Sequence, residues 1–157
     1  MIEVDSVATL AKAPHILEMS DIVPIRFWQA DDKSQLDSRD HIHPLLRETV
    51  SPQDSFGVYF EVYNLLYAND DLTHYTIEYE ILHTRPKTFL RLFRPRHRSL
   101  ASRTSYVDEV TSVRHKIELE PDDARVPSQL TIRVRVTDDT SRQEVSRLIN
   151  LELRYPE

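Results

Sequence analysis

Glycine is almost absent from this chain, since Gly57 is the single glycine among 157 residues. Average usage of about 7% would give on the order of 11 glycines in a chain of this length. Gly-rich phosphate loops, dinucleotide-binding fingerprints and Gly-x-Ser-x-Gly nucleophile elbows each need two or more glycines at fixed offsets. The sequence therefore excludes all three kinds of site.

Cysteine is missing altogether. Without it the chain forms no disulfide and has no thiol nucleophile, no iron–sulfur ligand and no thiolate ligand for zinc. Any catalytic or metal chemistry must come from histidine, carboxylate, hydroxyl or basic side chains.

Positive charge is also in short supply. The 20 Lys and Arg residues face 26 Asp and Glu residues, which gives a formal net charge of −6. A surface of this sign repels nucleic acid and acidic membranes, so we expect neither as a partner. The start Met1–Asp5 is acidic, unlike a signal peptide, and no apolar run approaches the ~18 residues that cross a bilayer. We expect no membrane insertion, and a cytoplasmic location if the chain is complete as written.

Alternation of apolar and polar residues dominates the chain. It is clearest where Tyr75, Ile77, Tyr79 and Ile81 share one face of an extended segment. A period of two is typical of half-buried strands. Strands are predicted over residues 15–28, 56–65, 72–83, 88–93, 110–119, 130–137 and 148–154. The first of these is interrupted by Pro24, and a hairpin-length connection separates 56–65 from 72–83.

Helical periodicity is nearly absent, with short candidates only at Val7–Ala13 and Glu144–Leu148. We therefore expect an all-β fold, a two-sheet antiparallel β-sandwich of immunoglobulin-like character with about seven strands. It would fill residues 1–157 as a single domain of a larger protein, with residues 1–14 loosely ordered. An up-and-down barrel is the alternative, disfavoured by long irregular connections at 29–55 and 94–109.

Charged residues occupy the outward positions of several predicted strands. These are Glu78 and Glu80, Glu118 and Glu120, and Arg133 and Arg135. Cross-strand pairs of opposite charge contribute about 0.2–1 kcal/mol each. A pair of glutamates on one strand could also form an acid/base dyad, but nothing nearby would separate their pKa values. We interpret them as paired surface charges.

The best metal-like spacing is His41-Ile42-His43, which Asp37 and Asp40 precede. Residues i and i+2 of an extended segment face the same side, so the two imidazoles could share an ion. Histidines in a polar loop are more often ordinary surface residues, and we expect no metal and no cofactor. His115 keeps the inward phase of its strand, which favours a hydrogen-bonded core histidine over a ligand.

A basic stretch stands out in the acidic chain. It contains Arg85, Lys87, Arg91, Arg94, Arg96, His97, Arg98 and Arg103. Arginine forks match carboxylate and phosphate oxygens. Pairing with the domain's own carboxylates is favoured over a protein-docking patch and over an anion site. Ser99, Ser102 and Ser105 lie beside His97, but no glycine elbow or oxyanion loop supports a hydrolase.

Two parts of the chain carry family-like patterns. Val58–Leu65 followed by Tyr75–Ile81 resembles the Y-F-E-[IV]-Y-N-L hairpin in the β-sandwich region of bacterial GWxTD-domain proteins. Val126–Asp138 followed by Asn150–Leu153 resembles the closing hairpin of that region, and Met19–Ile22 fits its entry strand. The resemblance implies an accessory C-terminal sandwich and a location in the cell envelope or periplasm.

The naming Gly-Trp-x-Thr-Asp motif is absent from the chain. Ser128 and the pair Ser141-Arg142 stand where the family's closing hairpin carries glycines. The resemblance therefore implies a fold and transfers no catalytic residue.

These observations favour a non-catalytic structural or protein-interaction module over an enzyme. Edge strands would be its contact surface, through strand addition or side-chain packing. Tyrosine and arginine anchor many interfaces. The candidate interaction residues are Tyr59, Glu61, Tyr63, Arg94, Arg96 and Arg98. The alternative is a binding domain for a small carbohydrate or anion that uses Trp28, tyrosines and arginines.

Overall fold

The structure is a computed structural model that describes residues 16–26, 44–45, 49–50, 56–84, 97–119 and 128–153. These residues form strands and connections, with no helix among them. The strands are β1 (Glu18–Met19), β2 (Val23–Arg26), β3 (Thr49–Val50), β4 (Phe56–Tyr63), β5 (Thr73–Thr84), β6 (His97–Asp108), β7 (Val113–Leu119), β8 (Ser128–Asp138) and β9 (Glu144–Leu153). Within these ranges no helix is long and apolar enough to cross a membrane.

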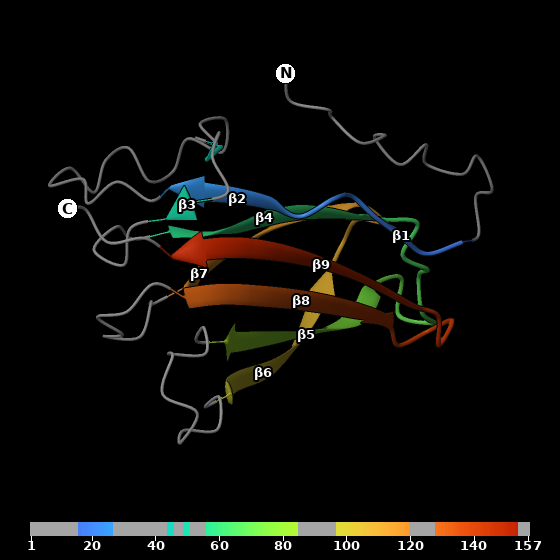
Figure 1. The fold of residues 1–157 in the computed structure, drawn as a ribbon. Helices are drawn as coiled ribbons and strands as arrows, with labels where there is room; N and C mark the ends of the chain where they lie inside the picture. The colour runs from blue at the N-terminus through green and yellow to red at the C-terminus, as the bar shows by residue number, and fades with distance from the viewer. Residues whose placement is uncertain are drawn as a thin grey trace, which may run out of the picture.

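The strands form two sheets of unequal width. In the narrow sheet, β1 and β2 pair in succession with one side of β4, and β7 pairs with its other side. The wide sheet has the order β3-β9-β8-β5-β6, and Figure 1 shows β9, β8, β5 and β6 side by side. All described pairings are antiparallel except that of β3 with β9. The expected all-β sandwich is confirmed, and a single closed barrel is not what these strands form.

The distribution of strands between the sheets is immunoglobulin-like. If β1 and β2 count as one strand and the short β3 is set aside, the first, second and fifth strands share the narrow sheet. The third, sixth and seventh strands share the other sheet, as in immunoglobulin domains. The fourth strand, β6, lies beside the third.

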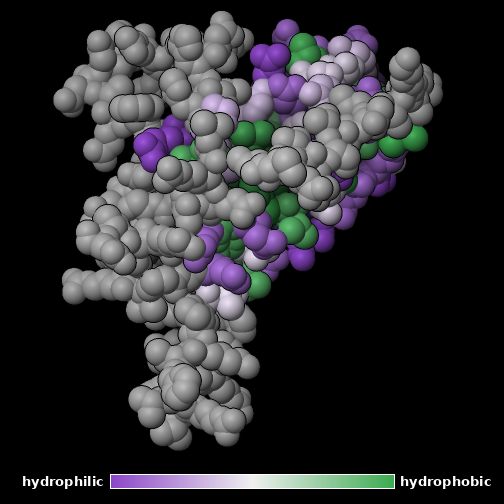
Figure 2. Space-filling view, turned by 45° about the horizontal axis from the view of Figure 1, so that its top comes forward, coloured by the Kyte–Doolittle hydropathy of each residue, from purple (hydrophilic) through white to green (hydrophobic). Residues whose placement is uncertain are grey.

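The core lies between the two sheets and follows the alternation of the sequence. Phe60 and Val62 of β4 and Ile132 and Val134 of β8 are each 0% exposed. Fully burying such a side chain contributes about 1.5–3 kcal/mol. Figure 2 shows hydrophobic residues in the centre of the view, between hydrophilic ones. The predicted strands at 72–83 and 130–137 are confirmed as β5 and β8.

Two expectations about connections are wrong. The range 94–109, expected to be an irregular connection, contains the long strand β6, which pairs along its length with β5. Arg103, Thr104 and Ser105 are exposed one after another, so this part of β6 lacks the alternation of a half-buried strand. In addition, β4 and β5 do not form a hairpin but lie in different sheets, because the connection after Asn64 crosses between layers.

The expected helical turn at Glu144–Leu148 is also wrong, since these residues begin β9 and pair with Arg133–Thr137 of β8. Pairing with β8 satisfies their backbone groups as a ladder, which a single helical turn would not do. The predicted strand at 15–28 is divided into β1 and β2. The expectations for residues 1–14, Val7–Ala13 and 88–93 lie outside the described residues.

Candidate functional site

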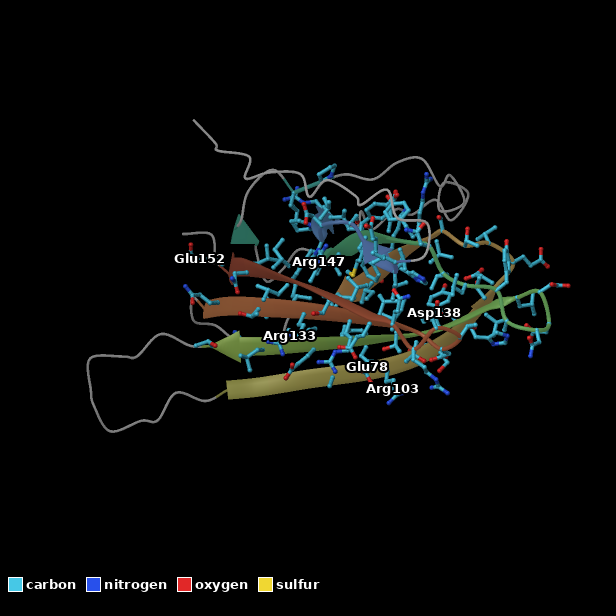
Figure 3. All side chains as sticks on the ribbon, turned by 90° about the vertical axis from the view of Figure 1, so that its right-hand side faces the viewer. Glu78, Arg103, Arg133, Asp138, Arg147 and Glu152 are labelled. Carbon is cyan, nitrogen blue, oxygen red and sulfur yellow. The ribbon has the colours of Figure 1, made fainter. Side chains whose placement is uncertain are left out.

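The outer face of the wide sheet carries a lattice of paired charges. Arg103 of β6 lies 3.3 Å from Glu78 of β5, and Arg135 of β8 lies 3.6 Å from the same carboxylate. Arg133 lies 3.6 Å from Glu80. Figure 3 shows Arg133, Glu78 and Arg103 on neighbouring strands of this face. The expected cross-strand pairing is confirmed for Glu78, Glu80, Arg133 and Arg135, whereas Glu120 lies outside the described residues. The arginines around the 330 Å³ hollow at this face are already matched by carboxylates.

The outer face of the narrow sheet carries a different cluster. The hydroxyls of Tyr59 and Tyr63 both donate to the carboxylate of Glu61. These residues are two apart along β4, so all three side chains point to the same side. Across the strand pair, Arg114 Nε of β7 lies 3.3 Å from Glu61 Oε1. The cluster therefore presents two aromatic rings around an ion pair.

Electrostatics fix the charge of this cluster. The two tyrosine hydrogen bonds lower the pKa of Glu61 below its usual value. Burial, together with the hydrogen bond to Glu61, raises the pKa of Tyr59 and that of Tyr63 to about 12. Near pH 7 the carboxylate is ionised and both phenols keep their protons. Neither the Glu61 carboxylate nor the two phenols are therefore set to exchange a proton near neutral pH.

A second polar network joins the two sheets beside β7. The hydroxyl of Tyr75 donates to Asp108 Oδ2 at 2.6 Å and contacts His115 Nε2 at 2.9 Å. Tyr106 stacks on Tyr75 at 5.4 Å between ring centroids and packs edge-on against His115 at 4.8 Å. Burial lowers the pKa of His115 and outweighs the opposing attraction of Asp108. The expected hydrogen bond of His115 is confirmed.

A groove of about 700 Å³ connects the tyrosine–glutamate cluster to this network. Its lining consists of Tyr59, Glu61, Tyr63, Tyr75, Asp108, Val110, Ser112, Val113, Arg114, His115 and Lys116. Glu61 belongs to the outer face of the narrow sheet, whereas Tyr75 and Asp108 belong to the wide sheet. The lining joins both sets through Val110 and Ser112 of the β6–β7 connection and the first part of β7, so the hollow passes from one side of the narrow sheet to the other there. β7 forms this edge of the sheet, since it pairs with β4 alone among the described strands.

The wide sheet extends underneath the edge of β7. On β6, Thr104 pairs with the buried Ile77 and so points to the inner side of the sheet, yet it is exposed. An added strand beside β7 would lie over this part of β6. At the opposite edge of the narrow sheet, Ile25 of β2 forms a bridge to Pro44, and Leu45 donates to the Pro24 carbonyl. In the described part of the chain, β7 is therefore an edge of the narrow sheet with no further strand beside it.

Neither a protein-family model nor a curated protein sequence matches this chain. The groove along β7 is accordingly interpreted from its own residues and geometry.

Three of the candidate interaction residues, Tyr59, Glu61 and Tyr63, come together in the groove. Arg94, Arg96, Trp28, His41 and His43 lie outside the described residues, as does the side chain of Arg98. Among the residues that are described, no three His, Asp or Glu side chains form a group that could hold a metal ion.

Sequence reasoning missed the network of Tyr75, Asp108 and His115. Asp108 and His115 lie 33 and 40 positions from Tyr75 along the chain. The one available signal was that Asp108 and His115 flank the short connection from β6 to β7, which brings them to the same end of the sandwich. Tyr75 contacts both Asp108 and His115, but its place beside them can be known only from the register of β5 with β6.

Proposed function

We propose that this chain is a non-catalytic interaction module that binds an extended polypeptide segment as an additional strand on β7. The observation that carries the proposal is the groove, which lies along the first part of β7, Val113–Lys116, and touches side chains on both sides of the narrow sheet. No other described strand than β4 pairs with β7. An edge strand has a row of unpaired backbone N–H and C=O groups that a further strand can satisfy.

The side chains around the groove would select the added strand. Successive side chains of a strand point to opposite sides of a sheet. One set would therefore face Arg114 and Lys116 on the outer side, and the other would face Tyr75 and His115 on the inner side. Tyrosine and arginine are frequent interface anchors because they combine a large contact area with hydrogen bonding.

A small carbohydrate or anion fits this geometry less well. Sites for small molecules enclose most of the surface of the ligand, whereas this groove lies along a strand edge, between two layers. The only tryptophan, Trp28, lies outside the described residues and adds no argument. The strand-addition proposal therefore makes fuller use of the described side chains.

Selection from a library of eight-residue peptides, followed by NMR, tests the proposal. We expect selected peptides to shift the amide signals of β7 and to give inter-strand contacts between peptide backbone and β7 backbone. The matched control is the same peptide with N-methyl groups at alternate backbone nitrogens, which keeps its side chains but loses half of its donors. We expect this control to bind at least tenfold more weakly.

Peptide contacts on the outer face of β5 and β8, or equal binding of the methylated control, would contradict strand addition. Thermal shifts with simple sugars, sulfate or phosphate in the absence of peptide binding would favour the small-ligand alternative.

The similarity to the sandwich region of GWxTD-domain proteins, with its implied envelope location, also stays a proposal. It is supported by the sequence patterns of β4, β5, β8 and β9, of which only β8 and β9 form a hairpin in this structure.

A further inference from the structure

We propose that the segment bound along β7 carries side chains of alternating charge, with two acidic residues toward Arg114 and Lys116 and one basic residue between them toward Asp108. This inference rests on the proposed function and names the chemistry of its partner. It concerns the first part of β7, Val113–Lys116, because the groove follows β7 only there. Three consecutive residues of an added strand span the two cations, and the middle one points to the opposite side from its neighbours.

The outer side of the groove is positively charged along β7. Arg114 and Lys116 are both exposed there. Arg114 contacts Glu61 through Nε at 3.3 Å, and its side chain stays 67% exposed, so its other guanidinium N–H groups can donate to a second carboxylate. Lys116 lies opposite Tyr59 of β4, and no carboxylate of the described residues pairs with it. Two acidic side chains of an added strand would complement this side.

The inner side of the groove is negatively charged instead. Asp108 lines it and lies opposite the buried Thr73 of β5, on the inner side of β6. Its Oδ2 accepts the hydroxyl of Tyr75 at 2.6 Å, and in the described ranges no lysine or arginine pairs with this carboxylate. The neighbouring His115 does not neutralise it near pH 7, because burial lowers the pKa of that histidine. A basic side chain would therefore complement Asp108.

The layers of the sandwich place Asp108 where the middle residue of the added strand would point. His115 of β7 contacts Tyr75 of β5, and β6 is the next strand of the wide sheet beyond β5. Neighbouring strands lie about 4.7–4.9 Å apart, so a strand added beside β7 lies over β6 in the same way as β7 lies over β5. Packed sheets are about 10 Å apart. Lysine and arginine have the long stems that such a gap requires.

The same arrangement determines the form of the partner. The part of β6 around the exposed Thr104 fills the layer beneath the added strand. A folded sandwich that offered one of its edge strands would bring its own second sheet into that layer. A single extended segment has no second layer and meets no such obstacle. We therefore expect the partner to be a chain terminus or a linker that becomes ordered on binding, as many recognition segments do.

Three acetylated and amidated heptapeptides test the charge pattern by isothermal titration calorimetry. In the probe, Thr-Val-Glu-Lys-Glu-Val-Thr, the two glutamates share one side of an extended chain and the lysine lies on the other. Its sequence reads the same in both directions, so parallel and antiparallel addition give the same pattern. The first control, Thr-Val-Lys-Glu-Lys-Val-Thr, has the signs exchanged. The second, Thr-Val-Glu-Glu-Lys-Val-Thr, keeps the composition and net charge of the probe but directs an acid toward Asp108.

We expect the probe to bind at least about tenfold more tightly than either control, because the controls replace opposite-charge neighbours with like-charge ones. The net charge of −6 attracts the positively charged first control and repels the negatively charged probe. A preference for the probe therefore comes from the local pairs. Equal or tighter binding of either control would overturn the charge pattern.

Two substitutions assign the preference to its residues. We expect Lys116→Glu to weaken binding of the probe by about threefold to tenfold. Asp108→Asn keeps an oxygen for the Tyr75 hydroxyl but loses the charge, so it should remove the advantage of the central lysine over glutamine in the probe. Matched controls are R142E and D21N, which change exposed residues outside the groove lining and should leave both measurements unmoved.

Circular dichroism checks that each variant is folded. If Asp108→Asn does not fold, the peptide comparisons on the wild-type chain decide alone. A probe whose affinity Lys116→Glu leaves unchanged, or a glutamine-centred peptide that binds the wild-type chain as tightly as the probe, would also overturn the pattern. If library peptides add to β7 without these charges, strand addition stands and only the partner chemistry is wrong. If no peptide shifts the β7 amides, the proposed function itself fails.

Discussion

Asp138 is a fully buried carboxylate at the end of β8, where Figure 3 labels it. It accepts hydrogen bonds from the Leu66 amide at 3.1 Å, from the Thr140 amide at 2.9 Å and from the Ser141 hydroxyl at 2.8 Å. It thereby connects the β4–β5 crossing to the β8–β9 turn. Its loss would leave the partly buried amides of Leu66 and Thr140 without this partner. A buried donor that lacks a partner costs about 1–3 kcal/mol.

We predict that Asp138→Ala lowers the free energy of unfolding by roughly 2–4 kcal/mol, as measured by urea denaturation. The matched control is Asp139→Ala in the same turn. The carboxylate of Asp139 lies 3.4 Å from the Thr76 hydroxyl at its nearest, a long hydrogen bond. We expect the control to cost less than about 1 kcal/mol. Equal losses for the two variants would show that the Asp138 hydrogen bonds are not what stabilises this corner.

His115 gives the fold a pH dependence whose sign follows from its environment. Burial lowers its pKa in the folded chain, whereas an unfolded histidine titrates near 6.5. Below pH ~6.5 the unfolded chain therefore binds a proton that the folded chain accepts less readily. The contribution of neutral His115 to the free energy of unfolding is therefore complete above pH ~6.5. It is lost as the pH falls through the pKa of His115 in the folded chain.

We predict that the wild-type chain loses more stability than His115→Gln between pH 7.5 and pH 5. Glutamine keeps an N–H donor near the Tyr75 hydroxyl but does not titrate. Urea denaturation at several pH values measures the difference between the two chains, and the other histidines cancel in it. Parallel pH profiles would contradict the assigned role of burial.

At the scale of elements, alternation predicts the strands that have one face in the core. β5 and β8 follow from Tyr75–Ile81 and Leu130–Val136 because every second residue is buried there or packs against the core. β6 does not, because its edge position leaves Thr104 and Ser105 exposed on opposite sides. Alternation is visible in a sequence only when one face of the strand is apolar and the other polar. An edge strand that is exposed on both faces has little such difference in polarity.

Assignment of strands to sheets is likewise beyond a local pattern. The residues after Asn64 read as a hairpin connection, but the chain crosses to the other layer there. Asn64 has a positive φ of 63°, and its side chain donates to the Ile16 carbonyl at 2.9 Å. The turn and this long-range hydrogen bond lie where the chain leaves the narrow sheet, and the spacing of apolar residues predicts neither.

The β8–β9 turn contains a residue in a conformation that favours glycine. Arg142 has a φ of 63°, in the left-handed region. That conformation costs an ordinary residue about 1–2 kcal/mol, whereas glycine adopts it freely but loses about 0.5–1 kcal/mol through its greater entropy when unfolded.

We predict that Arg142→Gly raises the free energy of unfolding by about 0.5–1 kcal/mol and the melting temperature by a few degrees. Differential scanning calorimetry measures the change. Arg142→Ala is the control, since alanine removes the side chain without relieving the backbone and should not stabilise the chain. A gain from alanine equal to that from glycine would assign the effect to the side chain instead.

At the scale of the whole molecule, the two sheets differ in width, and their edges are therefore arranged differently on the two sides of the sandwich. β1 lies near β9, and the Leu17 amide donates to Gln143 Oε1 at 2.8 Å, so the layers are joined on that side. On the opposite side β6 extends beneath the edge of β7, and the groove lies between them. The alternation of the sequence was enough to predict that Tyr59, Glu61 and Tyr63 lie together on one face of a strand. It could not predict that β7 is the edge beside them, because that depends on the complete strand order.

The most direct test of an available β7 edge is amide hydrogen exchange by NMR at concentrations where the chain is monomeric. In an edge strand, alternate amides point toward the neighbouring strand and the others point to solvent. We predict slow and fast exchange at alternate positions from Val113 to Leu119, and slow exchange at every buried position of the central strand β8. Occupation of the edge by a further strand should slow the fast set. Uniformly slow exchange along β7 in the monomer would contradict an available edge, because it would mean that another part of the chain already pairs with this strand.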